Sequence, residues 1–331
     1  MAKIAVVTGA SAGVGRATAE EFARHGYDLG LIARGEERLE NTASELSRTY
    51  GIRALPLRCD VADAAAVERA ADRVEAELGP IDVWVNVAMA TVFAPVSRLD
   101  AAEIERGTKV TYLGQVHGMM AALSRMRWRN RGTIVNVGSA LAYRSVPLQA
   151  VYCGAKAAIR GFVDSLRSEI IHDKLDIHLT MVDLPAVNTP QFDWAANKMG
   201  RKARPVAPIY QPEVPARAIY FAATHRRREV WVGTSTIKAI LGNRVAPGLL
   251  DWYLARTAYK GQLRDEPSSG NSEGNLFEPV AGDFSAHGDF DKQSRNLSVE
   301  MFTDRHKAAF WVGTLAALAV GGVALGRRLR A

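Results

Sequence analysis

The chain has 331 residues, of which 48% are hydrophobic and 23% charged, and its net charge is +7. This length accommodates one large α/β domain with an appendage, and this composition is ordinary for a globular core. The basic residues are scattered and form no zinc-finger or other nucleic-acid-binding pattern, so we expect no nucleic-acid partner. Two cysteines and seven histidines without ligand spacing argue against a disulfide framework and a metal site.

The first half of the chain alternates short apolar runs with helical segments, which predicts a parallel sheet built from βαβ units. The apolar runs are near-continuous, as expected for strands that helices cover on both faces. Right-handed crossovers then give a doubly wound, three-layer αβα sheet, the Rossmann fold. The predicted strands are Ile4–Thr8, Leu29–Ala33, Ala54–Cys59, Val83–Asn86, Thr133–Val137 and Ile177–Val182.

A glycine-rich loop follows the first predicted strand and leads directly into a predicted helix. Its glycines permit a tight turn, close approach of the backbone to a pyrophosphate, and close packing of the helix on the strand. The free N–H groups at the start of that helix favour an anion. The loop therefore predicts a dinucleotide site that includes Gly9, Ser11, Gly13, Val14 and Gly15.

The end of the second predicted strand bears on the choice of dinucleotide. It reads Ile32-Ala33-Arg34 and lacks the carboxylate that would bind a ribose 2′-hydroxyl. Arg34 can pair with a 2′-phosphate in bidentate fashion, and Ser11 is near enough in the loop to assist. We therefore expect NADP in preference to NAD. The alternative is that Arg34 is an ordinary solvated arginine.

Three polar side chains form the predicted catalytic site. Tyr152 and Lys156 stand four residues apart in a helix-compatible run, so they share one helix face. A lysine ammonium favours the phenolate and lowers the pKa of the tyrosine, which suits Tyr152 to general acid–base catalysis. Ser139 follows a predicted strand at the carboxyl edge of the sheet, where its hydroxyl can hydrogen-bond a substrate oxygen. A helix cap is the alternative role for this serine.

Together these motifs resemble the short-chain dehydrogenase/reductase family over residues 3 to about 235. The resemblance implies an NAD(P)-dependent enzyme that interconverts a small-molecule carbonyl and alcohol. It also implies a homodimer or homotetramer, because family members usually pair through the helix that carries the tyrosine. It rests on the TGxxxGxG loop at residues 8–15, Asp60-Val61 after the third strand, Asn86 and Ala88 after the fourth, and Ser139 with Tyr152-x3-Lys156.

The same resemblance implies roles for the remaining motif residues. Asp60 would contact the adenine with Val61 beside it, and Lys156 would also bind the nicotinamide ribose. Asn86 would stabilise the central strands near the cofactor, and Ala88 stands two residues after it in the same motif.

The sequence departs from the family pattern at two functional positions. Thr111 occupies the place of an asparagine that positions water in the proton relay to the lysine, so this relay would be rearranged. Thr189 is expected to reach the carboxamide or the phosphates, although Leu184-Pro185-Ala186 replaces the usual Pro-Gly before it. A dinucleotide-binding scaffold or sensor with little catalysis is therefore the alternative function.

The last third of the chain is less regular. Residues 186–212 predict a mobile loop over the ligand crevice, because five prolines occur from Pro185 to Pro212. A helix at Glu213–Thr224 and a strand at Val230–Val232 follow. We divide the chain into a catalytic domain (residues 1–260), a flexible polar linker (residues 261–304) and a C-terminal hydrophobic helix (residues 305–331).

Residues 308–326 contain no charge and are flanked by basic residues. Nineteen such residues suffice to cross a bilayer as a helix, which predicts a single-pass anchor with the catalytic domain in the cytoplasm. A helix packed on a soluble cytoplasmic protein is the alternative. Tyr143, Phe192 and Trp194 are expected to border the site, and with a membrane anchor they favour an apolar substrate.

Overall fold

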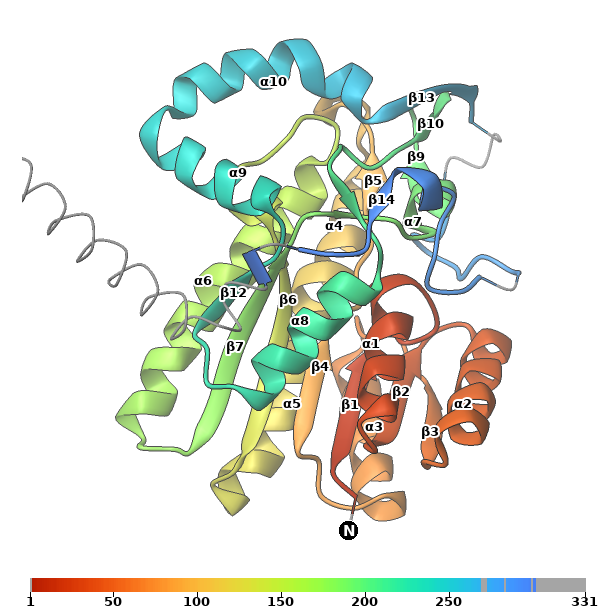
Figure 1. Ribbon diagram of the computed structural model, residues 1–331, viewed down its shortest axis with the longest axis vertical. Helices are drawn as coiled ribbons and strands as arrows, with labels where there is room; N and C mark the ends of the chain where they lie inside the picture. Colours follow the sequence, from red (N-terminus) through yellow and green to blue (C-terminus); the bar gives the residue numbers. More distant parts are fainter. Residues whose placement is uncertain (1, 269–272, 283, 299, 302–331) are drawn as a thin grey trace, which may run out of the picture.

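The computed structural model describes residues 2–268, 273–282, 284–298 and 300–301. At its centre lies a parallel sheet of seven strands in the order β12-β7-β6-β4-β1-β2-β3 (Figure 1). This order confirms the predicted doubly wound α/β fold, with the crossover from one half to the other between β1 and β4. The strands are β1 (Ile4–Thr8), β2 (Asp28–Ala33), β3 (Ala54–Arg58), β4 (Val83–Asn86), β6 (Gly132–Ser139), β7 (Ile177–Leu184) and β12 (Glu229–Trp231).

Helices cover both faces of the sheet, because the strands are apolar on both sides and need burial on each. On one face Phe22, Leu39 and Ile219 pack against the strands, and on the other Val67, Met119 and Ile159 do so. The helices of the first face are α1 (Gly13–Arg24), α2 (Glu36–Tyr50) and α8 (Glu213–Thr224). Those of the second are α3 (Ala64–Glu77), α5 (Gly114–Arg129) and α6 (Ala150–His172).

The proline-rich segment after β7 is paired into small sheets, which corrects the expectation of an irregular loop. These sheets also take in parts of the chain far away in sequence, so backbone pairing holds the segment in place. One sheet joins β8 (Ala186–Val187), β11 (Ile209–Tyr210) and β14 (Ser294–Arg295). The others join β10 (Arg201–Ala203) to β13 (Leu263–Pro267), and β5 (Val92–Phe93) to β9 (Ala196–Asn197).

The described part of residues 261–304 packs back on the domain, so the prediction of a flexible linker is wrong for these residues. Leu276 is fully buried in the core on the α3–α5–α6 side, and Phe290 is also buried. These two apolar side chains fix a stretch whose overall composition is polar. We call residues 273–282 and 284–291 the C-terminal strap.

Two further helices, α9 (Thr234–Val245) and α10 (Pro247–Gly261), lie beyond the carboxyl edge of the sheet, and α10 runs across the top of Figure 1. Among the described residues no helix is long and apolar enough to span a bilayer. The predicted anchor at residues 308–326 lies outside the described residues and stays a prediction.

Candidate active site

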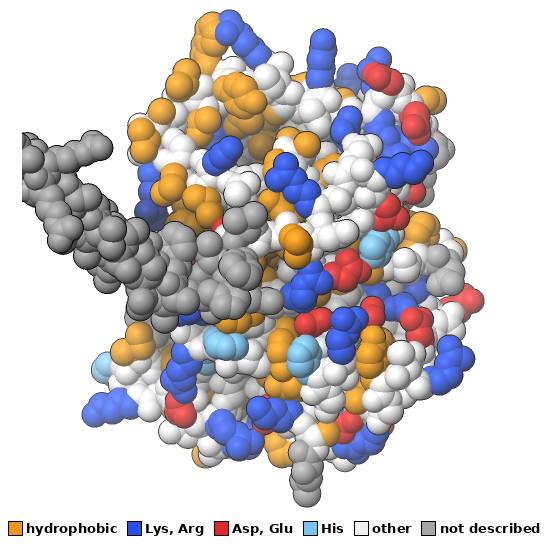
Figure 2. All heavy atoms as spheres, viewed as in Figure 1, with side chains coloured by type: hydrophobic (Ala, Val, Ile, Leu, Met, Phe, Trp, Pro, Cys, Tyr) orange, Lys and Arg blue, Asp and Glu red, His pale blue; other side chains and the backbone are white. Residues whose placement is uncertain are grey.

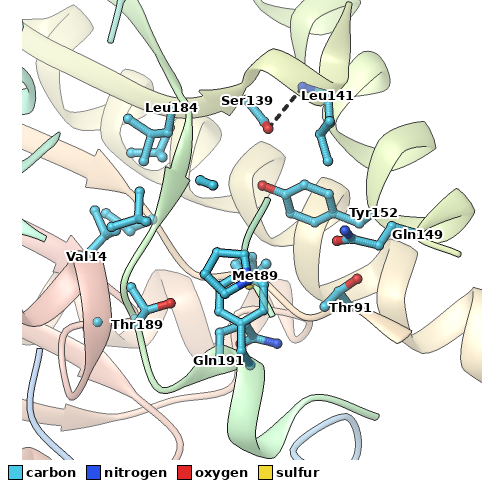
Figure 3. A pocket seen from close by; sticks show the side chains of 18 of the residues that line it. Val14, Met89, Thr91, Ser139, Leu141, Gln149, Tyr152, Leu184, Thr189 and Gln191 are labelled. Carbon is cyan, nitrogen blue, oxygen red and sulfur yellow. Dashed lines mark hydrogen bonds between the residues drawn. The ribbon is translucent and has the colours of Figure 1, made fainter. Parts of the chain in front are cut away.

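A cavity of about 620 Å³ lies at the carboxyl edge of the sheet, beside the ends of β1, β4, β6 and β7 (Figure 3). Its volume is within the ordinary range for ligand sites. Most predicted site residues line it, whereas Asn86 and Thr111 do not. The lining residues predicted from sequence are Gly9, Ser11, Gly13, Val14, Gly15, Arg34, Asp60, Val61, Ala88, Ser139, Tyr152, Lys156 and Thr189.

The glycine loop forms one end of this cavity, and its backbone requires glycine for two reasons. Gly9 and Gly13 have φ values of +70° and +55°, which residues with a Cβ rarely adopt. A Cβ at Gly15 would lie 2.0 Å from the carbonyl oxygen of Gly9. Ala12 caps α1 without a side-chain hydrogen bond. The Gly13 N–H donates to the Ser285 carbonyl oxygen, so the N–H groups that follow it at the start of the helix are the ones offered to an anion.

Replacing Gly15 with alanine is expected to weaken NADPH binding at least about tenfold and to destabilise the fold by about 1–3 kcal/mol, because Gly9 must move. Titration of cofactor fluorescence and thermal unfolding measure the two effects. Gly154→Ala is the matched control: this exposed glycine of α6 has no atom within 4 Å of an added Cβ. The control should gain about 0.5–1 kcal/mol and bind NADPH normally. Equal binding by both variants would contradict the tight-loop interpretation.

Arg34 lies at the end of β2, and the C-terminal strap holds it there. Its guanidinium donates to the carbonyl oxygens of Asn275, Leu276 and Phe277, the last at 2.7 Å. The alternative of a freely solvated arginine is therefore wrong. A guanidinium has five N–H groups, so these bonds leave donors for a phosphate in the cavity that Arg34 lines.

The strap also contacts the glycine loop itself. The Gly13 N–H donates to the carbonyl oxygen of Ser285 at 3.1 Å, and Arg38 donates to the carbonyl oxygens of Val280 and Gly282. Pro279 and Val280 line the cavity. The strap thus supplies a wall at the glycine-loop end of the site, which no sequence motif indicates.

Asp60 and Val61 line the cavity after β3, as expected. One carboxylate oxygen of Asp60 pairs with Arg106 at 2.6 Å, and the other accepts the Ala62 N–H at 3.0 Å. Arg106 also donates to the carbonyl oxygen of Leu276. These bonds hold the Asp60 carboxylate in place and tie it to the strap.

Asn86 is fully buried between the central strands. Its side chain accepts from the Trp84 indole at 2.8 Å and donates to Asn136 of β6 at 2.9 Å. This network joins β4 to β6, in keeping with a strand-stabilising role. Ala88 reaches the cavity, with its N–H bonded to the Thr8 hydroxyl.

Ser139 and Tyr152 face each other across the inner end of the cavity (Figure 3). The Ser139 hydroxyl oxygen accepts the N–H of Leu141 at 3.1 Å and caps the short 3₁₀ turn Ala140–Ala142, so the alternative role of a cap is also present. Accepting this bond leaves the serine O–H free to donate. Burial raises the pKa of Tyr152 far above its usual value of 10, and hydrogen bonding from Ser139 opposes this rise.

Lys156 is fully buried, with its Nζ 5.5 Å from the centre of the Tyr152 ring and donating to the carbonyl oxygen of Val137 at 2.6 Å. Burial lowers the pKa of Lys156 to about 7, and the charge of Asp183 opposes this shift. We expected the lysine to lower the pKa of Tyr152. That expectation is wrong, because burial of the phenol raises its pKa instead.

Thr111 lies in a π-helical turn, Lys109–Leu113, between α4 (Ala101–Thr108) and α5. Its buried hydroxyl donates to the Ala90 carbonyl oxygen at 2.8 Å and accepts the Ala90 N–H at 2.9 Å. The hydroxyl is therefore committed to the loop after β4 and lies outside the cavity lining, so Thr111 is not placed to contact substrate. This corrects its inclusion among the catalytic residues.

The segment after β7 forms the wall opposite Tyr152, at the position predicted for a loop over the crevice. Thr189 packs against the glycine loop, where a Cβ on Gly13 would lie 3.2 Å from its methyl group. Phe192 and Trp194 line the cavity as expected. The altered Leu184-Pro185-Ala186 sequence therefore does not prevent the backbone from bringing Thr189 to the cavity.

Tyr143 was expected at the border of the site, but it belongs to a buried acidic cluster behind it. Its hydroxyl hydrogen-bonds Glu229 and, at 3.3 Å, Asp183. Burial raises the pKa of Asp183 well above its usual range. The sequence signal for this cluster is Asp183, which stands between Val182 and Leu184 in β7. A carboxylate in such an apolar strand needs a polar partner when it is buried.

Known proteins resemble this chain in both sequence and structure. A family model for short chain dehydrogenases matches residues 3–199. The uncharacterized oxidoreductase YxnA of Bacillus subtilis (strain 168) is 29% identical over 282 residues, covering 85% of this chain and 79% of that protein.

Two solved structures share the fold and carry cofactors. An alcohol dehydrogenase from the archaeon Thermococcus sibiricus, complexed with 5-hydroxy-NADP, is 28% identical with a TM-score of 0.60. A metagenomic short-chain oxidoreductase in complex with NADP is 26% identical with a TM-score of 0.59. Each comparison covers 70% of this chain and 96% of the other. The chain therefore belongs to the short-chain dehydrogenase/reductase family and is an NAD(P)-dependent oxidoreductase.

Proposed function

We propose that the protein is an NADP(H)-dependent reductase or dehydrogenase that interconverts a carbonyl and an alcohol on an apolar substrate, with Tyr152 as general acid/base. The observation that carries this proposal is the convergence of the Ser139 and Tyr152 hydroxyls on one end of a cavity whose other end is the glycine loop. One continuous cavity can then hold a dinucleotide and a substrate together.

The lining of the cavity fits NADP(H). The glycine loop leaves the backbone bare where a pyrophosphate would lie, and Arg34 provides a cation at the end of β2 with no competing carboxylate on that strand end. NADP in the Thermococcus sibiricus and metagenomic relatives agrees with this choice. NAD is the less favoured alternative.

Arg34→Ala is expected to weaken NADPH binding by about 10–100-fold, the worth of a charge-assisted hydrogen bond, while NADH binding changes little. Because Arg34 also holds the strap, the measured quantity is the ratio of the two dissociation constants within one variant. Arg58→Ala is the control, since this exposed arginine of β3 pairs only weakly with Glu36 at the surface. An unchanged ratio in Arg34→Ala would contradict the NADP assignment.

When bound, NADP(H) supplies the hydride for carbonyl reduction or accepts it in alcohol oxidation. The Ser139 O–H donates to the substrate oxygen as negative charge develops there. Tyr152 is a neutral phenol at neutral pH, since the usual pKa of a tyrosine is about 10 and burial raises it further, so it can give its proton to that oxygen during reduction. Lys156, behind the phenol, holds the charge that stabilises the phenolate left behind.

An apolar substrate fits the remaining part of the cavity, in which polar groups are few. Gln149 and Thr91 stand near Tyr152 (Figure 3) and can orient a polar end of the substrate. The apolar lining of this part comprises Phe93, Leu141, Val146, Phe192, Val206, Tyr253 and Leu254.

Oxidation of NADPH against a panel of ketones and aldehydes of increasing chain length tests the proposal. We expect turnover that rises with the apolar length of the substrate. Tight NADPH binding without turnover of any panel member would instead favour the scaffold or sensor. The hydroxyl of Thr111 motivates that second function, because its proton and one of its acceptor positions are committed to Ala90.

Residues 305–331 are proposed to anchor the domain to a membrane, and a homodimer or homotetramer is proposed from the family. The exposed apolar side chains Met120 and Trp128 on α5 and Ile171 on α6 support pairing through these helices. We expect the full chain in the membrane fraction and a chain ending at residue 304 in the supernatant. A full chain that stays in solution without detergent would contradict the anchor.

A further inference from the structure

Helices α9 and α10 carry the largest group of exposed apolar side chains in the described part of the chain (Figure 2, upper left). Single exposed apolar residues are ordinary, but a group of them on adjacent helices indicates an interaction surface. The members, with their exposed fractions, are Leu241 (48%), Val245 (85%), Leu249 (72%), Trp252 (61%), Tyr253 (59%) and Tyr259 (42%). We call this group the α9–α10 surface.

One side of α10 faces the cavity and the other side is exposed. Leu254, Thr257 and Ala258 line the cavity, and Ala258 is the sole buried residue of this helix. Leu249, Trp252 and Arg256 follow the spacing of one helical stripe on the outer side. The helix therefore roofs the substrate end of the cavity, while its outer stripe has no covering within the described residues.

The charge on the α9–α10 surface is strongly one-sided. The two helices carry four basic side chains and one acidic one, a net charge of +3. The acidic residue, Asp251, is paired with Arg144, and the Arg256 guanidinium lies 3.3 Å from the centre of the Trp252 ring. Leucine, tryptophan and tyrosine flanked by unopposed cations are typical of helices that lie in the interface of a bilayer. The basic residues are Lys238, Arg244, Arg256 and Lys260.

The cavity extends to this surface. Tyr253 and Val206 both line it, yet they are 59% and 47% exposed, so its mouth lies between α10 and the segment after β7. An apolar molecule dissolved in a bilayer beneath the α9–α10 surface would reach this mouth without crossing water.

We propose that the α9–α10 surface docks on an anionic lipid bilayer, with Trp252 and Tyr259 at the headgroup level and the cavity mouth facing the lipid. A protein partner is less well matched, because interfaces between proteins are depleted in lysine whereas anionic headgroups attract it. This docking is separate from the predicted tail anchor, which by itself places no constraint on α10. The corollary, that the substrate arrives from the bilayer, rests on the proposed function.

A fluorescent thiol probe tests the docking in the full chain. Cys59 and Cys153 are both buried, so labelling is directed to an introduced cysteine. Val245→Cys reports on the α9–α10 surface, and Thr49→Cys, at an exposed position near the end of α2, is the matched control. With vesicles of equal parts phosphatidylcholine and phosphatidylserine, we expect the probe at position 245 to shift to the blue and to be quenched by spin-labelled lipid.

The probe at position 49 should stay in water under the same conditions. Anchoring by the tail alone leaves both probes in water, and that result would overturn the proposal. A blue shift at position 245 that appears without vesicles and grows with protein concentration would assign the surface to a second copy of the chain instead. The pair Lys238→Glu and Arg256→Glu should weaken the vesicle-dependent shift, and added salt should do the same.

A second measurement separates the corollary from the proposed function. Leu249→Glu with Val245→Glu should slow turnover of a long-chain ketone supplied in vesicles at least about tenfold, because burying two carboxylates in the interface is unfavourable. Neither residue lines the cavity, so turnover of a short, water-soluble ketone should be unchanged. If the wild type turns over neither the long-chain nor the short ketone, the proposed function is contradicted. The probe measurement would still decide whether the α9–α10 surface docks on a bilayer.

Discussion

Tyr152→Phe is expected to lower kcat by about 10²–10⁴-fold, the range for losing a positioned general acid. The phenol is the group of the cavity whose proton can reach a substrate oxygen beside Ser139 (Figure 3). The ring remains and fills the same space, so NADPH binding and the melting temperature should change little. Stopped-flow hydride transfer and a fluorescence titration measure these quantities independently.

Ser139→Ala serves as the companion variant. It removes the hydrogen bond to the developing oxyanion and the cap on the 3₁₀ turn, but it leaves the proton donor in place. We therefore expect a smaller fall in kcat than for Tyr152→Phe, with some loss of thermal stability from the cap. Turnover by Tyr152→Phe at the wild-type rate would remove Tyr152 from the mechanism.

The positions of the central strands along the chain follow from local sequence patterns, but the strand ends do not. The expected strands stopped at Val137 and Val182, where the apolar runs end. In the structure Gly138 pairs with Asp183 and Ser139 with Leu184, so the ladder continues through polar residues. Backbone hydrogen bonding carries a strand beyond its hydrophobic part, and a hydropathy pattern does not report on it.

The placement of the proposed catalytic side chains at the cavity could be predicted because their geometry is local. Tyr152 and Lys156 share a helix face at a spacing of four residues, and Ser139 stands at the end of a strand. The strap could not be predicted in the same way. It is bound to Arg34 and Gly13 through backbone carbonyl oxygens, which every residue possesses and no side-chain pattern reveals.

The protonation of the site was also beyond sequence reasoning. The pairing of a lysine with a phenol predicts a lowered tyrosine pKa if both groups are solvated. Lys156 is fully buried and Tyr152 is partly buried at the cavity wall, and desolvation acts on each in the direction of its neutral form. Depth of burial depends on how α6 packs against β6, which is a property of the whole fold.

Lys156→Met is expected to lower kcat/KM by about 10²-fold or more, because the phenolate of Tyr152 loses its stabilising charge. The same change should raise stability at low pH. The fold lowers the pKa of Lys156 from 10.5 to about 7, which means that a charged ammonium at this position opposes folding. Methionine fills a similar volume without charge, although the Val137 carbonyl oxygen loses its donor.

The pH dependence distinguishes this effect from simple repacking. Between pH 7 and 10.5 the unfolded wild-type lysine holds a proton that the folded one has released, so wild-type stability rises with pH in this window. The difference in unfolding free energy between variant and wild type should therefore favour the variant most at or below pH 7. It should shrink by up to about 1.4 kcal/mol per pH unit above that. Urea unfolding of both proteins from pH 6 to 10 measures the difference, and a pH-independent value would show that Lys156 titrates as it does in water.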